Sequence, residues 1–177
     1  MSIRNFKQYK PDIDPTVYID PSAQVIGQVK VGKNSSVWPN VTIRGDVNRI
    51  DIGNNSNIQD NSVLHVTSEY PGSPKGGYPL KMGDNVTIGH HVILHGCTIG
   101  NSCLIGMGSC VLDGAVIEDN VLIAAGSLIA QNKIVKSGFL WMGSPAKPIR
   151  ELNQSELNWL SLSANHYIDL KNEYMNN

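Results

Sequence analysis

Aliphatic residues recur at every sixth position along most of the chain. The series keeps one phase from Ile13 to Ile43, a second from Ile52 to Leu94 and a third from Ile99 to Val135. Two changes of phase over such a length are few for a chance pattern. The members are Ile13, Ile19, Val25, Val31, Val37, Ile43, Ile52, Ile58, Leu64, Met82, Ile88, Leu94, Ile99, Ile105, Val111, Ile117, Ile123, Ile129 and Val135.

The six-residue period predicts an all-β fold, a parallel β-helix over residues 1–150. Six matches neither the 3.6 residues of a helical turn nor the longer alternating strands of a hairpin ladder. Small or turn-forming residues often follow the aliphatic one, as in Val31-Gly32 and Ile88-Gly89, so each unit pairs a short strand with a tight turn. We expect the repeated aliphatic side chains to point to the axis of the coil.

Two segments depart from the repeat. Residues 68–80 read SEYPGSPKGGYPL, and their prolines and glycines predict a loop pushed out of the coil. After Val135 the motif GSPAK ends the repeat. Residues 151–177 predict a helix that packs back on the β-helix. Asn153 or Ser155 can cap this helix, and Glu156 lies in its first turn. The apolar residues at helical spacing are Leu157, Leu160, Ala164 and Ile168.

Charge and composition narrow the partners. Fourteen Lys and Arg stand against 15 Asp and Glu, with no basic block to neutralise phosphates, so we expect no nucleic acid. No apolar run reaches signal-peptide or membrane-span length, which predicts a cytoplasmic protein without membrane contact. The three cysteines lack CxxC spacing and suit buried, reduced thiols in that compartment.

Three of the five histidines lie in the stretch TIGHHVILHGCTIG, residues 87–100. His65 and His95 each follow an axial leucine, and if the loop takes 12 of the 30 residues between them, the other 18 make one full coil of three units. The two imidazoles would then stand on neighbouring rungs, about 4.8 Å apart, and could share one metal ion. His90 has another phase, so a third ligand is better supplied by His90 of a neighbouring chain. His91 is expected to be an exposed bystander.

Several motifs together resemble the γ-class carbonic anhydrases, a family of hexapeptide-repeat proteins. They are IRGDVN (43–48), NIQDNSVLH (57–65), GHHVILHGC (89–97), IGMGS (105–109) and GSPAK (143–147). The resemblance implies a single-stranded left-handed β-helix with three units per triangular coil. It also implies a homotrimer with a zinc site at each interface, whose ligands map onto His65 and His95 of one subunit and His90 of the next.

The resemblance also implies the activity, which is reversible hydration of CO2 to bicarbonate. Three neutral imidazoles leave zinc a coordination position for water, and the ion lowers the pKa of that water toward about 7. Imidazole also accepts iron or cobalt, so the sequence leaves the metal open. The resemblance assigns roles to six further residues. Gln59 would lie beside the zinc-bound group, and Arg44 and Asp46 would form a pair at the interface. Asn57 and Asp60 would orient Gln59 or Arg44, and Tyr167 would also belong to the site.

The chain departs from the family pattern where protons are transferred. An archaeal member of the class has two glutamates at the positions of Val47 and Ser68. Proton transfer must then use another group, for which Glu69, Tyr70 and Tyr167 are candidates, or the chemistry differs.

Three other functions compete with CO2 hydration. Many hexapeptide-repeat proteins are acyltransferases that use an interfacial histidine as a base, which would need only one of the three histidines. The same metal site could instead hydrolyse acyl-CoA thioesters. A non-catalytic trimer held together by metal is the third alternative.

Overall fold

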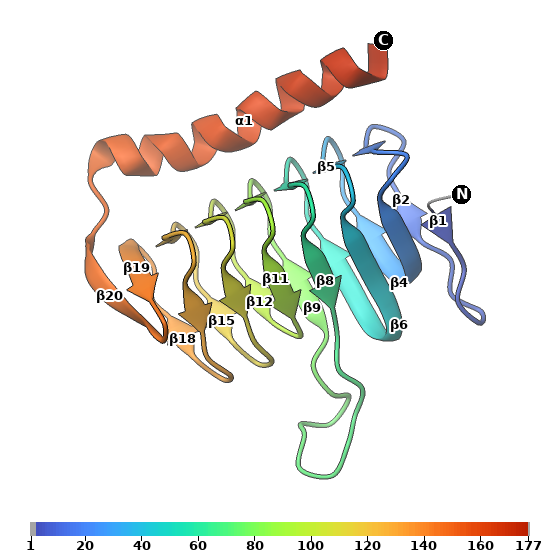
Figure 1. The fold of residues 1–177 in the computed structure, drawn as a ribbon, viewed down its shortest axis with the longest axis horizontal. Coiled ribbons are helices and arrows are strands. Elements are labelled where there is room, and N and C mark those ends of the chain that lie inside the picture. The colour runs from blue at the N-terminus through green and yellow to red at the C-terminus, as the bar shows by residue number, and fades with distance from the viewer. Residues whose placement is uncertain (1–2, 177) are drawn as a thin grey trace.

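The computed structural model describes residues 3–176 and shows a parallel β-helix with one long helix lying along it (Figure 1). The strands form three faces. The first face holds β1 (Ile3–Arg4), the first halves of β4 (Gln24–Val31) and β6 (Thr42–Ile52), β8 (Val63–His65), β11 (Ile93–His95), β14 (Cys110–Val111) and β17 (Leu128–Ile129). The second face holds β2 (Asp12–Ile13), the second halves of β4 and β6, β9 (Leu80–Met82), β12 (Thr98–Ile99), β15 (Val116–Ile117) and β18 (Ile134–Val135).

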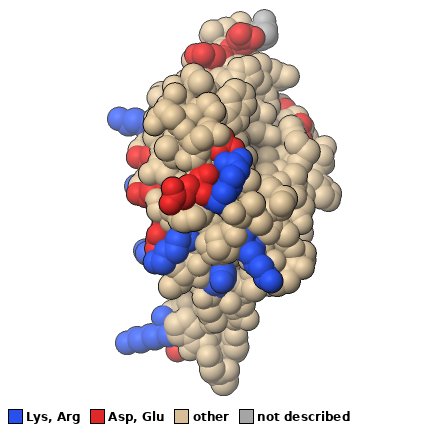
Figure 2. Space-filling model, turned by 90° about the vertical axis from the view of Figure 1, so that its left-hand side faces the viewer, with Lys and Arg blue, Asp and Glu red and all other residues tan. Residues whose placement is uncertain are grey.

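The third face lies under the helix, and its last two strands close the carboxy-terminal end of the coil. It holds β3 (Tyr18–Ile19), β5 (Ser36–Val37), β7 (Asn57–Ile58), β10 (Thr87–Ile88), β13 (Leu104–Ile105), β16 (Leu122–Ile123), β19 (Phe139–Gly143) and β20 (Ala146–Glu151). Only β19 and β20 pair as antiparallel named strands among the described residues. Figure 2 shows this closed end, where Lys and Arg side chains stand among Asp, Glu and uncharged surface.

The axial aliphatic residues form the core, which confirms the predicted parallel β-helix. From Val25 to Val135 every member of the series is buried, whereas Ile13 and Ile19 at the open amino-terminal end are only half-buried. The axial series extends further than expected, because Trp141 lies six residues after Val135 and pairs in register with Ile123. The left-handed course of the coil stays a prediction from the resemblance.

All three irregularities of the repeat lie at one corner, between the first and second faces. On successive rungs, three extra residues separate Ile43 from Ile52, the loop separates Leu64 from Met82, and one residue fewer than usual separates Leu94 from Ile99. Gly45 is required there, because a Cβ on it would lie 2.5 Å from the carbonyl oxygen of Gln28. This corner is therefore shaped differently from the other two.

The predicted loop projects from the same corner (Figure 1), although Leu80, its last predicted residue, is buried and begins β9. An isolated bridge between Thr67 and Tyr78 closes its base, and the Tyr78 side chain is buried there. Cys97 is also buried in the core beside this corner, and burial raises the pKa of its thiol to about 12. A protonated, packed thiol at Cys97 agrees with the expectation of buried, reduced cysteines.

Helix α1 (Gln154–Asn176) docks on the third face. Asn153 caps it, because its side-chain oxygen accepts the backbone N–H of Glu156 while the Glu156 carboxylate accepts the N–H of Asn153. Leu160 and Ala164 are buried against the coil, while Leu157 and Ile168 are half-buried. No helix within the described residues combines the length and apolar character that a membrane crossing needs.

Candidate metal centre

His65 and His95 lie side by side at the irregular corner. They end β8 and β11, which pair in parallel with His95 opposite His65, so the expected placement on neighbouring rungs is confirmed. The Nδ1 atom of His65 lies 3.0 Å from the Nε2 atom of His95. Both side chains are partly buried, and their rings are tilted by 58° to each other.

A carboxylate holds the outer nitrogen of each of these rings. His65 Nε2 lies 3.0 Å from Asp46 Oδ1, and His95 Nδ1 lies 2.8 Å from Asp113 Oδ1. Since a carboxylate only accepts hydrogen bonds, we assign the ring proton of each neutral imidazole to the nitrogen that faces the aspartate. The two nitrogens that face each other then both carry lone pairs.

Two lone pairs 3.0 Å apart fit a shared cation. Two imidazole nitrogens, each about 2.05 Å from a tetrahedral zinc ion, would be separated by about 3.3 Å. An aspartate on the second nitrogen of a histidine ligand is also the usual arrangement around such ions. The pair His65 and His95 therefore supplies two ligands with the right donor chemistry and nearly the right spacing.

The protonation of this corner favours metal binding at neutral pH. Burial, reinforced by the Arg44 guanidinium, holds the pKa of His65 below its ordinary value, so the ring stays neutral. Burial alone would raise the pKa of Asp46, but hydrogen bonds from Arg44 and His65 outweigh it and hold this pKa below its ordinary value. Arg44 and Asp46 form the expected ion pair.

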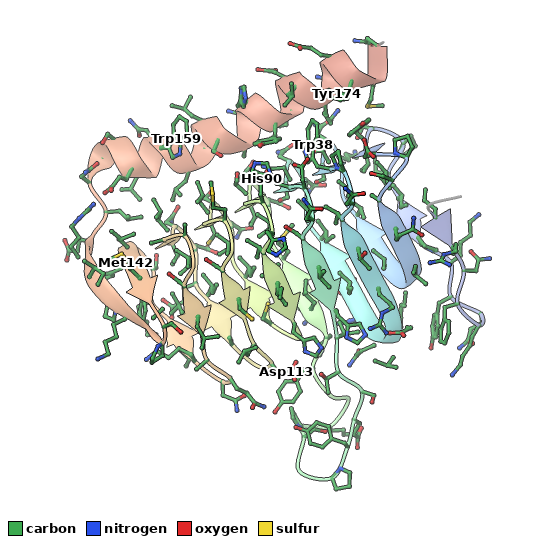
Figure 3. All side chains as sticks on the ribbon, in the orientation of Figure 1. Trp38, His90, Asp113, Met142, Trp159 and Tyr174 are labelled. Atoms are coloured by element: carbon green, nitrogen blue, oxygen red, sulfur yellow. The ribbon has the colours of Figure 1, made fainter. Side chains whose placement is uncertain are left out.

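His90 lies at the opposite edge of the first face. It sits in the turn between β10 and β11, where its Nδ1 is 2.9 Å from Asp60 Oδ2, and its side chain is half-exposed. Figure 3 shows His90 beside α1 and Asp113 at the far edge, beside the loop. Within residues 3–176, no three His, Cys, Asp or Glu side chains are grouped so that they could hold a metal ion. One chain thus brings two of the three predicted ligands together and keeps the third apart.

The neighbouring histidine behaves differently. His91 is exposed and its backbone has a φ of 60°, in the left-handed region. Asp60, which was expected to orient Gln59 or Arg44, accepts a hydrogen bond from the ring of His90 within the chain. Each of the three candidate ligands therefore has its own aspartate.

A chain of buried hydrogen bonds links Gln59 to the helix. The Gln59 side-chain amide donates to Asn57 Oδ1 at 3.1 Å, and the Asn57 amide donates to Thr87 Oγ1 at 3.0 Å. Thr87 Oγ1 in turn lies 3.0 Å from Ser163 Oγ on α1. Asn57 thus holds the Gln59 amide, and α1 takes part through the buried Ser163.

Gln59 and Tyr167 both line a cavity of about 310 Å³ between α1 and the third face. Its walls are mostly apolar, and at Gly89 and Met107 it reaches the edge that carries His90. The Tyr167 ring packs edge-on against Trp38, with centroids 5.4 Å apart. Burial, with a contribution from Asp60, raises the pKa of Tyr167, so its phenol stays protonated at neutral pH.

Sequence reasoning missed Asp113, Thr87 and Ser163. Asp113 had a signal, because it follows His95 by 18 residues, one more than the 17 that separate Ile93 from its partner Cys110, and so lies at the same corner on the next rung. It also accepts a hydrogen bond from Thr67 at the base of the loop. Thr87 and Ser163 are 76 residues apart, and no repeat connects them.

The outer surface of the first face carries an apolar ladder, defined as Val63, Ile93, Cys110 and Leu128. These residues follow one another on successive rungs, and Val63 and Ile93 are 40% and 45% exposed in the single chain. The ladder runs between the edge with His65 and His95 and the edge with His90. The third face is covered in part by α1, whereas the structure shows no such cover within residues 3–176 for this ladder.

Comparisons with known proteins point to one family. A family model described as bacterial transferase hexapeptide (six repeats) matches residues 11–45 and 96–131. The chain is 51% identical over 173 residues to Protein YrdA of Escherichia coli, covering 98% of this chain and 94% of YrdA. It is 46% identical over 158 residues to a probable carbonic anhydrase of Methanocaldococcus jannaschii, covering 89% of this chain and 94% of that protein.

Two further relatives are named for two different activities. Gamma carbonic anhydrase 2, mitochondrial, of Arabidopsis thaliana is 43% identical over 169 residues, which cover 96% of this chain and 60% of the plant protein. A crystal structure of a putative acetyltransferase from Bacillus cereus superposes with a TM-score of 0.91 at 41% identity, covering 97% of this chain and 95% of that one.

Proposed function

Because this chain belongs to the γ-carbonic-anhydrase-like family of hexapeptide-repeat proteins, we propose that it catalyses the reversible hydration of CO2 to bicarbonate at zinc sites between the subunits of a homotrimer. The observation that carries the proposal is the convergence of two imidazole lone pairs, one from His65 and one from His95, each set by its own aspartate.

The position of His90 supports a site shared between chains. In such a site, the edge that carries His65 and His95 in one chain meets the edge that carries His90 in another. The two surfaces differ, so the contact is heterologous, and it produces a filament unless the subunits close into a ring. Three subunits, as the family resemblance implies, make such a ring. The same contact would cover the apolar ladder, whose exposure in one chain needs an explanation.

The residues of the site have distinct tasks in this chemistry. When bound, zinc supplies a Lewis acid and a hydroxide nucleophile at neutral pH. Asp46 and Asp113 fix the tautomers that offer lone pairs to the ion. The Gln59 amide, held by Asn57, is positioned to hydrogen-bond an oxygen of the substrate or product, and Arg44 neutralises Asp46 at the interface. The apolar walls beside Gln59 suit a small uncharged gas.

Stopped-flow CO2 hydration by the metal-loaded protein, together with metal content per subunit, tests the proposal. We expect the zinc-loaded protein to be active and to contain one ion per subunit. Protein loaded with cobalt or iron serves for comparison. His65→Ala should lose both activity and metal, whereas His91→Asn, a change at the neighbouring left-handed position that asparagine tolerates, should keep both. A wild-type protein no faster than His65→Ala under reducing and oxidising conditions would sink the proposal.

Subunit complementation tests the shared site. His90→Ala and His95→Ala should each be inactive alone. A trimer that mixes them contains a contact where the intact His65 and His95 of one chain meet the intact His90 of another, so co-expression should restore part of the activity. No recovery in mixed trimers of confirmed composition would show that the three histidines do not act across chains.

An acyltransferase is the second candidate, because the Bacillus cereus relative of known structure is named a putative acetyltransferase. That function needs one histidine as a base and leaves the two aspartate-held imidazoles without a purpose. Binding of CoA by a metal-free protein, with no CO2 hydration, would favour the acyltransferase. Metal-dependent release of free thiol from acyl-CoA would favour a thioester hydrolase. A trimer that needs metal to assemble but shows no activity in any of these assays would favour a structural role.

A further inference from the structure

Proton removal is a separate problem for this site, and the inference drawn from it rests on the proposed function. Hydration of CO2 by water gives bicarbonate and one proton, and that proton must reach the buffer before the next turnover. A carrier must titrate near neutral pH and touch solvent, which describes an imidazole better than any other side chain.

The groups next to the candidate ligands are already engaged. Asp46, Asp60 and Asp113 each accept a hydrogen bond from one of the ligand histidines. Val47, next to Asp46, and Ser68, at the start of the loop, carry no group that titrates near neutral pH. The carrier must therefore come from elsewhere.

The loop and the helix tyrosine do not supply it. The Glu69 carboxylate accepts the backbone N–H of Gly76 inside the loop, and neither Glu69 nor Tyr70 lines the cavity beside Gln59. Tyr167 does line that cavity, but its raised pKa keeps the phenol protonated at neutral pH. A phenol that does not ionise cannot carry the proton by titrating.

His166 is an imidazole that touches both solvent and the cavity. It lies on α1 beside Tyr167, it is exposed to solvent, and it lines the same cavity as Gln59. Among the residues that line this cavity, His166 and Tyr167 are the titratable ones. His91, the other histidine outside the ligand set, is exposed but does not line it. The cavity's volume of about 310 Å³ is room for about ten waters at roughly 30 Å³ each, enough to bridge its two ends.

We propose that His166 is the proton carrier of this site. The cavity under α1 leads from Gln59 and the edge with His90 to the imidazole of His166. The proton released by hydration passes along water in the cavity to the unprotonated ring nitrogen of His166. The ring then gives it to a buffer base and returns to its neutral form, so the balance closes with no other reactant.

Steady-state CO2 hydration at low and high buffer concentration tests the role, using zinc-loaded wild type, His166→Gln and the matched control His91→Asn. At low buffer we expect kcat of His166→Gln to fall about tenfold or more while kcat/KM stays near the wild-type value, because the hydration step itself is untouched. Added imidazole should restore kcat. His91→Asn should match the wild type throughout.

NMR of the metal-free protein with 15N-labelled histidine gives a readout independent of turnover. The signal that disappears in His166→Gln must titrate between about pH 6 and 8. Unchanged low-buffer kcat in His166→Gln, failure of imidazole to restore it, or a His166 signal that does not titrate in this range overturns the role while leaving the proposed function intact. A wild type that is inactive at every buffer concentration overturns both.

Discussion

Replacement of Thr87 by valine would test the buried hydrogen bonds that join the helix to Gln59. Valine has nearly the same shape as threonine but lacks the hydroxyl, so the packing of β10 is kept while two polar partners lose their bonds. Asn57 loses the acceptor of its amide N–H, and the Ser163 hydroxyl loses its partner across the helix contact. All three side chains are buried, with exposed fractions of 1%, 3% and 8% for Asn57, Thr87 and Ser163.

The expected cost follows from these two orphaned groups. Each buried polar group left without a partner costs about 1–3 kcal/mol, so Thr87→Val should lower the free energy of unfolding by about 3 kcal/mol. For a chain of this length that corresponds to a fall in Tm of about 6–12 °C. The double variant Thr87→Val with Ser163→Ala removes one of the two orphans and should recover about half of the loss.

Thermal and urea unfolding of the metal-free protein at one fixed subunit concentration measures the effect, because both metal and assembly shift apparent stability. Thr98→Val is the matched control. Thr98 also lies on a short strand, but its hydroxyl makes no hydrogen bond within the described residues, so this change should stay within about 0.5 kcal/mol. If Thr87→Val were as mild as Thr98→Val, or if the double variant were less stable than the single one, the network would not hold the helix.

Three other predictions concern the ligands, the interface and the helix cap. Asp113→Asn should weaken metal binding about 10- to 100-fold, because the carboxylate sets the His95 tautomer, and competition with a chelator that shows unchanged affinity would contradict this. Ile93→Lys puts a charge in the apolar ladder, so analytical ultracentrifugation should show monomers that bind no metal. A stable trimer of this variant would mean that the interface lies elsewhere. Hydrogen bonds from Arg150 and from the Asn153 N–H lower the pKa of Glu156 to about 2, so its contribution to stability is fully present above about pH 4.5 and is lost as pH falls toward 2. Glu156→Gln should therefore lower Tm more at pH 6 than near pH 2, where much of the wild-type carboxylate is protonated, and an equal deficit at both pH values would refute the assignment.

The parallel coil and the pairing of His65 with His95 could be predicted from the sequence alone. Both depend on a period of six that is local and repeated, so counting residues places a side chain on a rung without knowledge of distant contacts. The loop at residues 68–80 and the helix cap at Asn153 were also readable, since prolines, glycines and a capping asparagine act within a few residues. Even the 12 residues assigned to the loop agree with the pairing of Leu64 with Leu94.

The surroundings of the candidate ligands depend on packing between distant parts of the chain. The corner with its changed spacing sets Asp46 and Asp113 beside the two histidines, although the sequence shows no more than two shifts of phase. Helix α1 returns to the third face and brings Ser163 to Thr87 and His166 to the cavity of Gln59, contacts that no period records. His90 and His95 lie at opposite edges of the first face, despite a separation of only five residues in sequence. Periodicity fixes position along the coil, whereas the shape of a corner and the docking of a helix come from packing between residues far apart in the chain.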